Sequence, residues 1–228
     1  MALTHENNND IVANSGSKKQ EKEEKILNIG SLNVRTFTEC KPSLLQHFME
    51  EKGFTIFGIS ETNVDSKYAK AFNNDKYIGY FSDSNKKGSG VGIIVSKEIE
   101  KYIQKSESID NRIIYIDIFT KKKKIRIIQI YLHANDKDKK SRLELCKKLE
   151  NVIHQAHRQR KEVILLGDFN INAAKYRDPD RDTKKWKYEI LDNLIKEGLT
   201  DTMDELYNTQ IPPTYFPRNK TPRKLDFI

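Results

Sequence analysis

Apolar side chains recur in short runs along most of the chain, but few occur in its first 25 residues, which are rich in Asn, Ser, Lys and Glu. A segment with so little to bury cannot offset the entropy that it loses on ordering. The pattern therefore predicts a disordered tail over residues 1–25 and one folded domain over residues 26–228. A single core is usual for an α/β domain of this size.

Seven of the apolar runs predict strands, because they are short, rich in Ile, Val, Phe and Tyr, and bounded by turn residues. Only Thr120 and four lysines separate the fifth run from the sixth, a spacing that suits an antiparallel hairpin. The predicted strands cover residues 26–33, 54–60, 77–81, 91–96, 112–119, 125–132 and 162–166.

Three segments show the periodicity of amphipathic helices, at residues 43–52, 138–159 and 184–197. Gly53 and Gly198 follow the first and the third as helix stops. Between the last two helices, the stretch 172–183 is rich in Arg, Asp and Pro and is predicted to be a polar loop. Strands that alternate with one-sided helices indicate a layered α/β fold.

The balance of charged residues bears on the binding partner. Lys and Arg number 41 against 33 Asp and Glu, a net charge of +8, which favours a polyanionic partner, with nucleic acid ahead of an anionic membrane. A solubilising surface is the alternative. The two cysteines, Cys40 and Cys146, do not suggest a disulfide framework. With no signal peptide or membrane span in the sequence, we expect an intracellular location, with the nucleus suspected.

Candidate chemistry appears where three predicted strands end. VILLGDFNI delivers Asp168 and Asn170 at alternate positions, which in a strand would place both side chains on one side. GISET ends in Glu61 and LNIGSLNVRT carries Asn33. Carboxylate and carboxamide groups together can bind a hard cation, position a water and hold a phosphoryl oxygen, as phosphodiester hydrolysis requires. The alternative for each segment is an ordinary strand-to-loop turn.

These three segments, taken in order with KGSGVGIIV (87–95), IRIIQIYLH (125–133) and KLDFI (224–228), resemble the endonuclease/exonuclease/phosphatase superfamily. The nearest likeness is to the apurinic/apyrimidinic-type endonuclease domains of non-LTR retrotransposons. The resemblance implies a four-layer αββα sandwich of two mixed, mainly antiparallel sheets. It places the active site at one edge of the packed sheets.

The resemblance also implies a role for each matching residue. The metal, Mg²⁺ or alternatively Mn²⁺, would be held by Glu61, supported by Asn33 and shared with Asp168. Asp168 would activate water or protonate the leaving oxygen. The remaining matches are Tyr131 as a contact to the scissile phosphate, Asn170 as the amide that holds the phosphate, and Asp226 as the carboxylate that orients a catalytic His.

The chain departs from the family pattern at several positions. Arg35 stands where some relatives have Asp, and His133 where many have Pro. The family also ends in a Ser-Asp-His segment several strands beyond the position of Asp226, so the resemblance implies a domain that is incomplete at its C-terminus. Whether such a chain is active is in question, because a missing general acid or base removes on the order of 10²- to 10⁴-fold in rate.

The leading hypothesis is a Mg²⁺-dependent DNA endonuclease of retroelement origin, with DNA as its partner and no obligate protein partner evident. One alternative is a catalytically dead nucleic-acid-binding module. Another is a phosphatase or phosphodiesterase of the same fold that acts on a lipid or RNA. The candidate DNA contacts are Arg177, Arg181, Lys122 and Arg223, although basic residues in loops are often merely solvated.

Overall fold

The computed structural model describes residues 27–37, 40–63, 72–84, 88–134, 139–178, 185–207, 211–218 and 221–228. The predicted tail over residues 1–25 lies outside them. The helices and strands, in chain order, are β1 (Ile29–Asn33), α1 (Lys41–Lys52), β2 (Ile56–Ser60), β3 (Tyr77–Phe81), β4 (Val91–Ser96), α2 (Lys97–Glu100), β5 (Ile103–Ile109), β6 (Ile113–Phe119), β7 (Lys124–Tyr131), α3 (Lys139–Arg158), β8 (Glu162–Asp168), α4 (Ala173–Arg177), α5 (Lys185–Lys196), α6 (Thr202–Tyr207) and β9 (Asp226–Phe227).

The strands form two mixed sheets. The first has the order β1-β2-β4-β3, and the second has the order β5-β6-β7-β8-β9. In each sheet one pair is parallel, β1 with β2 and β7 with β8, and the other pairs are antiparallel. The hairpin predicted from the lysine-rich spacing is present as β6 and β7. The prediction of two mixed, mainly antiparallel sheets is confirmed.

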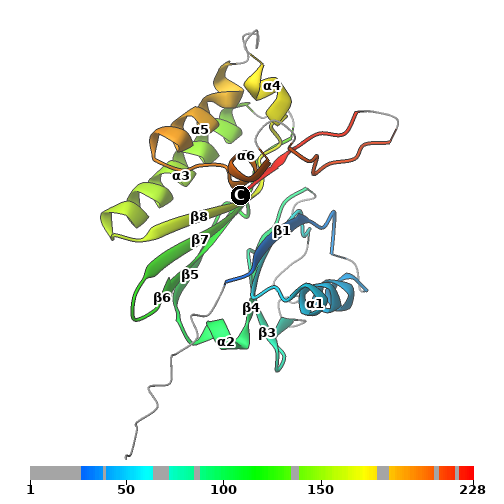
Figure 1. Cartoon of the computed structure of the whole chain (residues 1–228), viewed down its shortest axis with the longest axis vertical. Helices are drawn as coiled ribbons and strands as arrows, with labels where there is room; N and C mark the ends of the chain where they lie inside the picture. The colour runs from blue at the N-terminus through cyan, green and yellow to red at the C-terminus, as the bar shows by residue number, and fades with distance from the viewer. Residues whose placement is uncertain are drawn as a thin grey trace, which may run out of the picture.

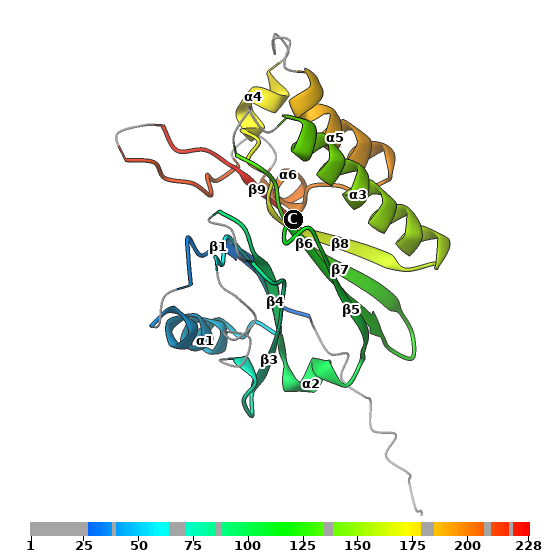
Figure 2. The same cartoon turned by 180° about the vertical axis from the view of Figure 1, so that it is seen from behind.

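Three apolar clusters hold four layers together. One lies between the five-stranded sheet and helices α3 and α5, and a second lies between the two sheets. The third packs α1 on the outer face of the four-stranded sheet. Figures 1 and 2 show the same succession from opposite sides, with α3 and α5 on one side, the two sheets in the middle and α1 on the other side. This is the predicted αββα sandwich.

Alternating side chains on β6 show how the sequence builds these layers. Ile113 and Tyr115 face the helices, whereas Ile114, Ile116 and Ile118 face the other sheet. A strand with apolar residues at both sets of positions must be buried on both faces, which is why its sequence, IIYIDIF, is almost wholly apolar. The central strands were predictable for this reason.

Two strands and three short helices were not predicted. Strand β5 is an edge strand whose sequence, IQKSESI, is mostly polar, and its five interior residues are exposed. Strand β9 has only two residues. Helix α4, Ala173–Arg177, lies within the stretch 172–183 that was predicted to be a loop, so that prediction is wrong for this part. Its start is explained by Asn172, whose side chain accepts a hydrogen bond from the Ala174 N–H.

A buried ionic group joins β6, β7 and the start of β8. The Arg126 guanidinium donates two hydrogen bonds of 2.8 Å to Asp117, and Lys161 donates one of 2.6 Å to the same carboxylate. Arg126 also donates to the backbone oxygen of Val152, which ties the sheet to α3. Each charged side chain in the group therefore has a partner of opposite sign, as burial requires.

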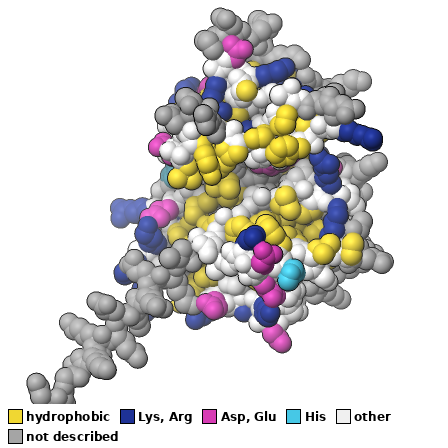
Figure 3. Space-filling model, turned by 45° about the vertical axis from the view of Figure 1, so that its right-hand side comes forward, with side chains coloured by type: hydrophobic (Ala, Val, Ile, Leu, Met, Phe, Trp, Pro, Cys, Tyr) yellow, Lys and Arg dark blue, Asp and Glu magenta, His cyan; other side chains and the backbone are white. Residues whose placement is uncertain are grey.

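Apolar side chains also reach the surface, and Figure 3 shows them gathered across the middle of one face. No helix in the described part of the chain has the length and apolar character that crossing a membrane requires. The large exposed apolar residues are Leu32, Leu44, Phe48, Ile195, Leu206, Tyr207 and Phe216.

Candidate active site

The candidate residues meet where strands of both sheets end. Across the five-stranded sheet, Tyr131 lies beside Asp168 and Asp168 lies beside Asp226, so the three residues occupy one row of β7, β8 and β9. In the other sheet, Asn33 is the last residue of β1 and Glu61 directly follows β2, its parallel neighbour. Parallel strands end at the same edge of a sheet, which explains why these residues share one rim. We call Asn33, Glu61, Tyr131, Asp168 and Asp226 the rim residues.

A hydrogen bond between two side chains joins the sheets at this rim. The Asn33 amide donates to one carboxylate oxygen of Asp168 at 3.0 Å, although 135 positions separate the two residues. The Asn33 side-chain oxygen accepts from the Arg35 N–H at 3.0 Å, which fixes the amide's orientation. The second Asp168 oxygen accepts from the Asn170 N–H at 2.9 Å. Both oxygens of Asp168 are thus held by defined donors.

The electrostatics of the rim are unbalanced. Asp168 is 6 % exposed, and its burial, with the nearby charges of Asp226 and Glu61, raises its pKa to about 6. Burial also raises the pKa of Asp226. The Tyr131 pKa is raised to about 12 by burial and by the charges of Glu61 and Asp168. A group of carboxylates in which Asp168 and Asp226 have raised pKa values is typical of sites that bind a cation or move a proton.

The backbone around the rim is unusual in the same places. Glu61, Asn63 and Asn170 have positive φ angles of 57°, 53° and 51°. Residues other than glycine adopt positive φ angles at an energetic cost, and residues strained in this way concentrate at functional sites. Gly167 has φ 137°, and a Cβ there would lie 2.0 Å from the Ile130 carbonyl oxygen. The glycine before Asp168 is therefore required by the close approach of β7.

Asn170 is placed near the rim by a hydrogen bond, and not by the strand alternation that the sequence predicted. Strand β8 ends at Asp168, and Asn170 lies beyond it in the left-handed region, so strand periodicity does not place its side chain. Instead its amide donates to the Leu132 backbone oxygen at 2.8 Å. The prediction that alternation aligns Asp168 and Asn170 is wrong in its reason, because the chain turns immediately after Asp168.

The donor set fits a hard cation that takes few protein ligands. Among the described residues, no group of three or more His, Cys, Asp and Glu side chains is arranged to hold a metal ion by itself. Mg²⁺ is commonly bound by one or two carboxylates, with water and substrate phosphate as its other ligands. Glu61 and Asp168 supply such oxygens, and a cation near them would offset the burial and the repulsion that raise the Asp168 pKa. The residues present therefore fit Mg²⁺ or Mn²⁺.

The predicted DNA contacts do not lie together. Lys122 is in the β6–β7 turn, at the opposite end of β7 from Tyr131, and β7 itself is roughly 23 Å long at about 3.3 Å per strand residue. Arg177 forms ion pairs with Asp201 and Asp204. Arg181 lies outside the described residues. Arg223 is on the segment between α6 and β9, which projects from the body in Figure 1.

That projecting segment is tied to the rim. The Thr214 hydroxyl oxygen accepts from the backbone N–H groups of Leu225 and Asp226 at 3.0 and 3.1 Å. Tyr215 forms a β-bridge with Arg223, and the Arg35 guanidinium lies 5.4 Å from the Tyr215 ring centroid. The segment therefore brings Arg223 to the side of the molecule on which the rim lies.

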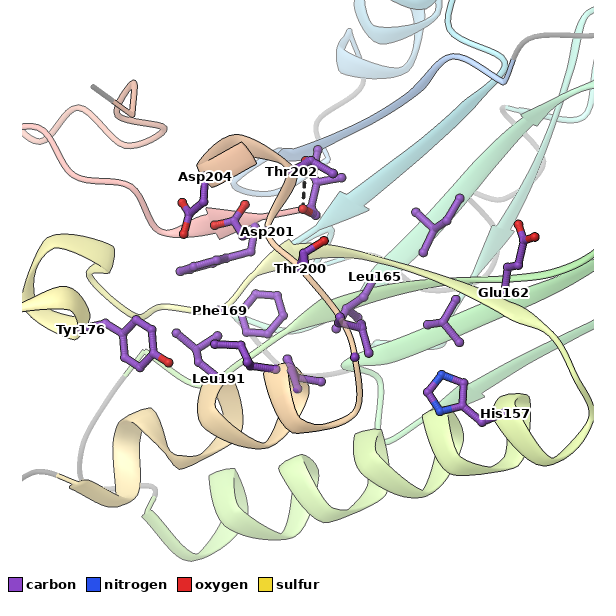
Figure 4. Close-up of a pocket in the computed structure, with 18 of the residues that line it drawn as sticks. His157, Glu162, Leu165, Phe169, Tyr176, Leu191, Thr200, Asp201, Thr202 and Asp204 are labelled. Atoms are coloured by element: carbon purple, nitrogen blue, oxygen red, sulfur yellow. Dashed lines mark hydrogen bonds between the residues drawn. The ribbon is translucent and has the colours of Figure 1, made fainter. Parts of the chain in front are cut away.

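Two apolar cavities lie near the rim without including its carboxylates. One of about 470 Å³ lies between β8, β9, α5 and α6, where Leu165, Leu191 and Phe169 point into it (Figure 4). Val163 and Leu165 of β8, which line this cavity, face the helices, whereas Leu166 of β8 and Tyr131 of β7 face the other sheet. The second, of about 320 Å³, lies between β1 and α1. Asn33 is among the residues that line the second cavity, but neither cavity includes a rim carboxylate.

Three polar residues near the rim were not found from the sequence. Lys41 donates to the backbone oxygens of Val34 and Thr36 at 2.6 and 2.7 Å and so holds the loop after Asn33. Asn63 and Arg112 make further contacts between loops. Each is a single polar residue beside a strand end, and such residues carry no sequence signal that distinguishes them from solvated ones.

The two packed mixed sheets between helical layers, with a rim of carboxylates and amides at one edge, define a DNase I-like α/β sandwich. The chain belongs to the Endonuclease/Exonuclease/phosphatase family, whose model matches residues 30–228. The family prediction is therefore confirmed. No curated protein matches the chain.

Solved structures support the fold. The 3′ phosphatase NExo from Neisseria, bound to a product DNA hairpin, has a TM-score of 0.69 and 19% identity, covering 89% of this chain and 85% of that one. An AP endonuclease from Archaeoglobus fulgidus has a TM-score of 0.67 and 16% identity, with the same coverage of 89% and 85%. The endonuclease domain of a telomere-specific non-LTR retrotransposon has a TM-score of 0.57 and 19% identity, covering 86% and 81%. At these identities the likeness establishes the fold.

Proposed function

We propose that this protein cleaves phosphodiester bonds of DNA with the help of Mg²⁺, as an endonuclease of retroelement origin. The observation that carries the proposal is the buried Asp168 carboxylate, which Asn33 holds at the junction of two sheets. The names of similar structures add support, since they describe a phosphatase with a DNA product, an AP endonuclease and a retrotransposon endonuclease domain. The net charge of +8 favours the same polyanionic substrate.

Glu61 and Asp168 would hold the metal ion, and Asn33 would keep Asp168 in place. Such an ion, when bound, polarises a phosphoryl oxygen and makes a bound water more acidic. Tyr131 keeps its hydroxyl proton at neutral pH, because its pKa is about 12, and can donate it to a phosphoryl oxygen. Asn170 has a second amide hydrogen beyond the one donated to Leu132, and we assign it to the phosphate.

A nicking assay tests this function. Supercoiled plasmid and an abasic duplex are incubated with the protein in Mg²⁺ and, separately, in EDTA. We expect nicking only with Mg²⁺, and a loss of about 10²- to 10⁴-fold in Asp168→Ala, since a positioned acid–base group contributes about that much. Asp75→Ala is the matched control, because Asp75 is an exposed carboxylate at the far end of the other sheet. It should leave the rate unchanged.

The same assay separates the alternatives. DNA binding without Mg²⁺-dependent nicking by the wild-type protein would replace the enzyme with a nucleic-acid-binding module. Hydrolysis of a phosphoinositide or an RNA in preference to both DNA substrates would keep the chemistry and change the substrate class. Equal nicking by wild type and Asp168→Ala would remove the assigned site.

A further inference from the structure

Asn63, two residues after Glu61, ties three loops together. Its amide donates to the Thr36 hydroxyl oxygen at 2.7 Å, in the loop that follows β1. Its side-chain oxygen accepts from the backbone N–H of Gly88 and, at 3.1 Å, from that of Ser89, in the loop that precedes β4. The Asn63 N–H also donates to the Ser89 oxygen at 2.9 Å. The loop that carries Glu61 is thus fixed on both sides.

Arg112 makes the corresponding contacts from the other sheet. Its guanidinium donates to the Gly88 oxygen at 2.8 Å and to the Tyr131 backbone oxygen at 3.2 Å. The same guanidinium lies 5.0 Å from the centroid of the Tyr131 ring. In addition, the Tyr131 N–H donates to the Arg112 oxygen at 2.9 Å. Arg112 therefore holds both the backbone and the ring of Tyr131.

Gly88 is the point at which the two sets of contacts meet. Its N–H is held by Asn63 and its carbonyl oxygen by Arg112, so the two faces of one residue are bound from two sheets. The result is a continuous path from the Glu61 loop through Asn63, Gly88 and Arg112 to Tyr131. The charge of Glu61 also helps to raise the Tyr131 pKa, as expected of two side chains that lie close together at the rim.

We infer that Asn63 and Arg112 are positioning residues, which form an inter-sheet bridge through Gly88 that sets the distance between Glu61 and Tyr131. The inference rests on the proposed function, because it assigns the bridge to the same reaction. The two rim residues belong to different sheets, and packed sheets alone leave the ends of their loops adjustable. Displacements of about 1 Å can cost a reaction about 10²-fold, so a bridge at this point has consequences for rate.

The test is a double-mutant cycle with Asn63→Ala and Arg112→Met. We expect each single variant to lower kcat for Mg²⁺-dependent nicking by about 10- to 100-fold, with KM for DNA within about twofold, because the bridge touches no substrate. The double variant should be no worse than the poorer single variant, since both act through one path. Arg112→Lys should be intermediate, because an ammonium cannot reproduce the forked contacts.

A second measurement, Mn²⁺ binding by calorimetry without DNA, reports on the Glu61 loop independently of nicking. We expect both single variants to bind Mn²⁺ more weakly than the wild type. The matched control is Asn74→Ala, because the Asn74 side-chain oxygen likewise accepts from two backbone N–H groups and its amide likewise donates to a side chain, but it lies at the far end of the sheet. Its thermal stability should fall as much as that of Asn63→Ala, with kcat and Mn²⁺ affinity unchanged.

The outcomes separate the bridge from the proposed function. A wild-type protein that binds Mn²⁺ but nicks no DNA would end the proposed function, and weaker Mn²⁺ binding in both variants would still support the bridge. Additive losses of kcat in the double variant would overturn the bridge, and so would a loss of kcat in Asn74→Ala as large as that in Asn63→Ala. Nicking by the wild type would still support the proposed function in either case. Unchanged Mn²⁺ affinity and unchanged kcat in both single variants would also overturn the bridge.

Discussion

The two ends of the five-stranded sheet treat buried charge in opposite ways. At the end near the β6–β7 turn, Asp117 is 2 % exposed and is paired with Arg126 and Lys161. At the rim, Asp168 is 6 % exposed, and its neighbours are two further carboxylates and an amide. The two residues have the same side chain and nearly the same burial, yet only one has its charge compensated.

The pKa values follow this difference. Burial alone would raise the pKa of Asp117, but hydrogen bonds and charge from Arg126 and Lys161 outweigh it, so the pKa lies below its usual value. Burial raises the pKa of Asp168 to about 6, and the nearby carboxylates act in the same direction. Burial of a carboxylate does not by itself mark a functional site. What distinguishes the rim is the missing compensation, which a cation or a proton would supply.

The largest effect is expected at the compensated end. Replacing Asp117 with Ala leaves Arg126 and Lys161 buried without their carboxylate partner, and breaking a buried pair in this way costs about 3–5 kcal/mol of unfolding free energy. Urea unfolding measures the loss. The triple change Asp117→Leu, Arg126→Met and Lys161→Met removes every charge and should recover most of it. A loss below about 1 kcal/mol in Asp117→Ala would show that the two cations find other partners.

The same ionic group also predicts how the stability of the protein changes as the pH falls. Because the folded pKa of Asp117 is lowered, its contribution to stability is present above its usual pKa of 3.8 and is lost as the pH falls through the folded value. Wild-type stability should therefore fall more steeply than that of the triple variant in this acid range.

Removing the charge of Asp168, at the uncompensated end, should raise the stability that removing Asp117 lowers. Asp168→Asn removes a charge that burial and like charges disfavour, at the expense of one hydrogen bond, so in EDTA at pH 7 we expect a gain of about 1–2 kcal/mol. A raised folded pKa means that the wild type takes up a proton earlier than the unfolded chain, so its stability rises as the pH falls from about 7 towards 3.8. The difference between variant and wild type should therefore shrink over that range. A variant that is less stable than wild type at every pH would contradict this account.

The comparison also shows what the sequence could and could not predict. The mainly apolar sequences of β6 and β7 follow from burial on both faces, and the polar sequence of β5 hides a strand because that edge is exposed. Asp168 and Glu61 were visible as carboxylates at strand ends. Their environment was not, because the Asn33–Asp168 hydrogen bond spans 135 positions and depends on the packing of two sheets. Nothing local to Asp117 or Asp168 indicates which one is paired.

The smallest expected effect concerns DNA binding at the two ends. Lys122 lies at the compensated end, far from the rim, and Arg223 lies on the segment that Thr214 ties to Asp226. If DNA lies across the rim, Arg223 is the one of these two residues that can neutralise a phosphate. The slope of log Kobs against log salt should therefore decrease in magnitude by about 0.9 in Arg223→Ala, and it should stay unchanged in Lys122→Ala, which serves as the matched control. Fluorescence anisotropy with a catalytically impaired Asp168→Ala background in Mg²⁺ at several salt concentrations measures both slopes without cleavage of the probe. A decrease in Lys122→Ala with none in Arg223→Ala would place the DNA along the β6–β7 turn, and the rim would then no longer be where the substrate binds.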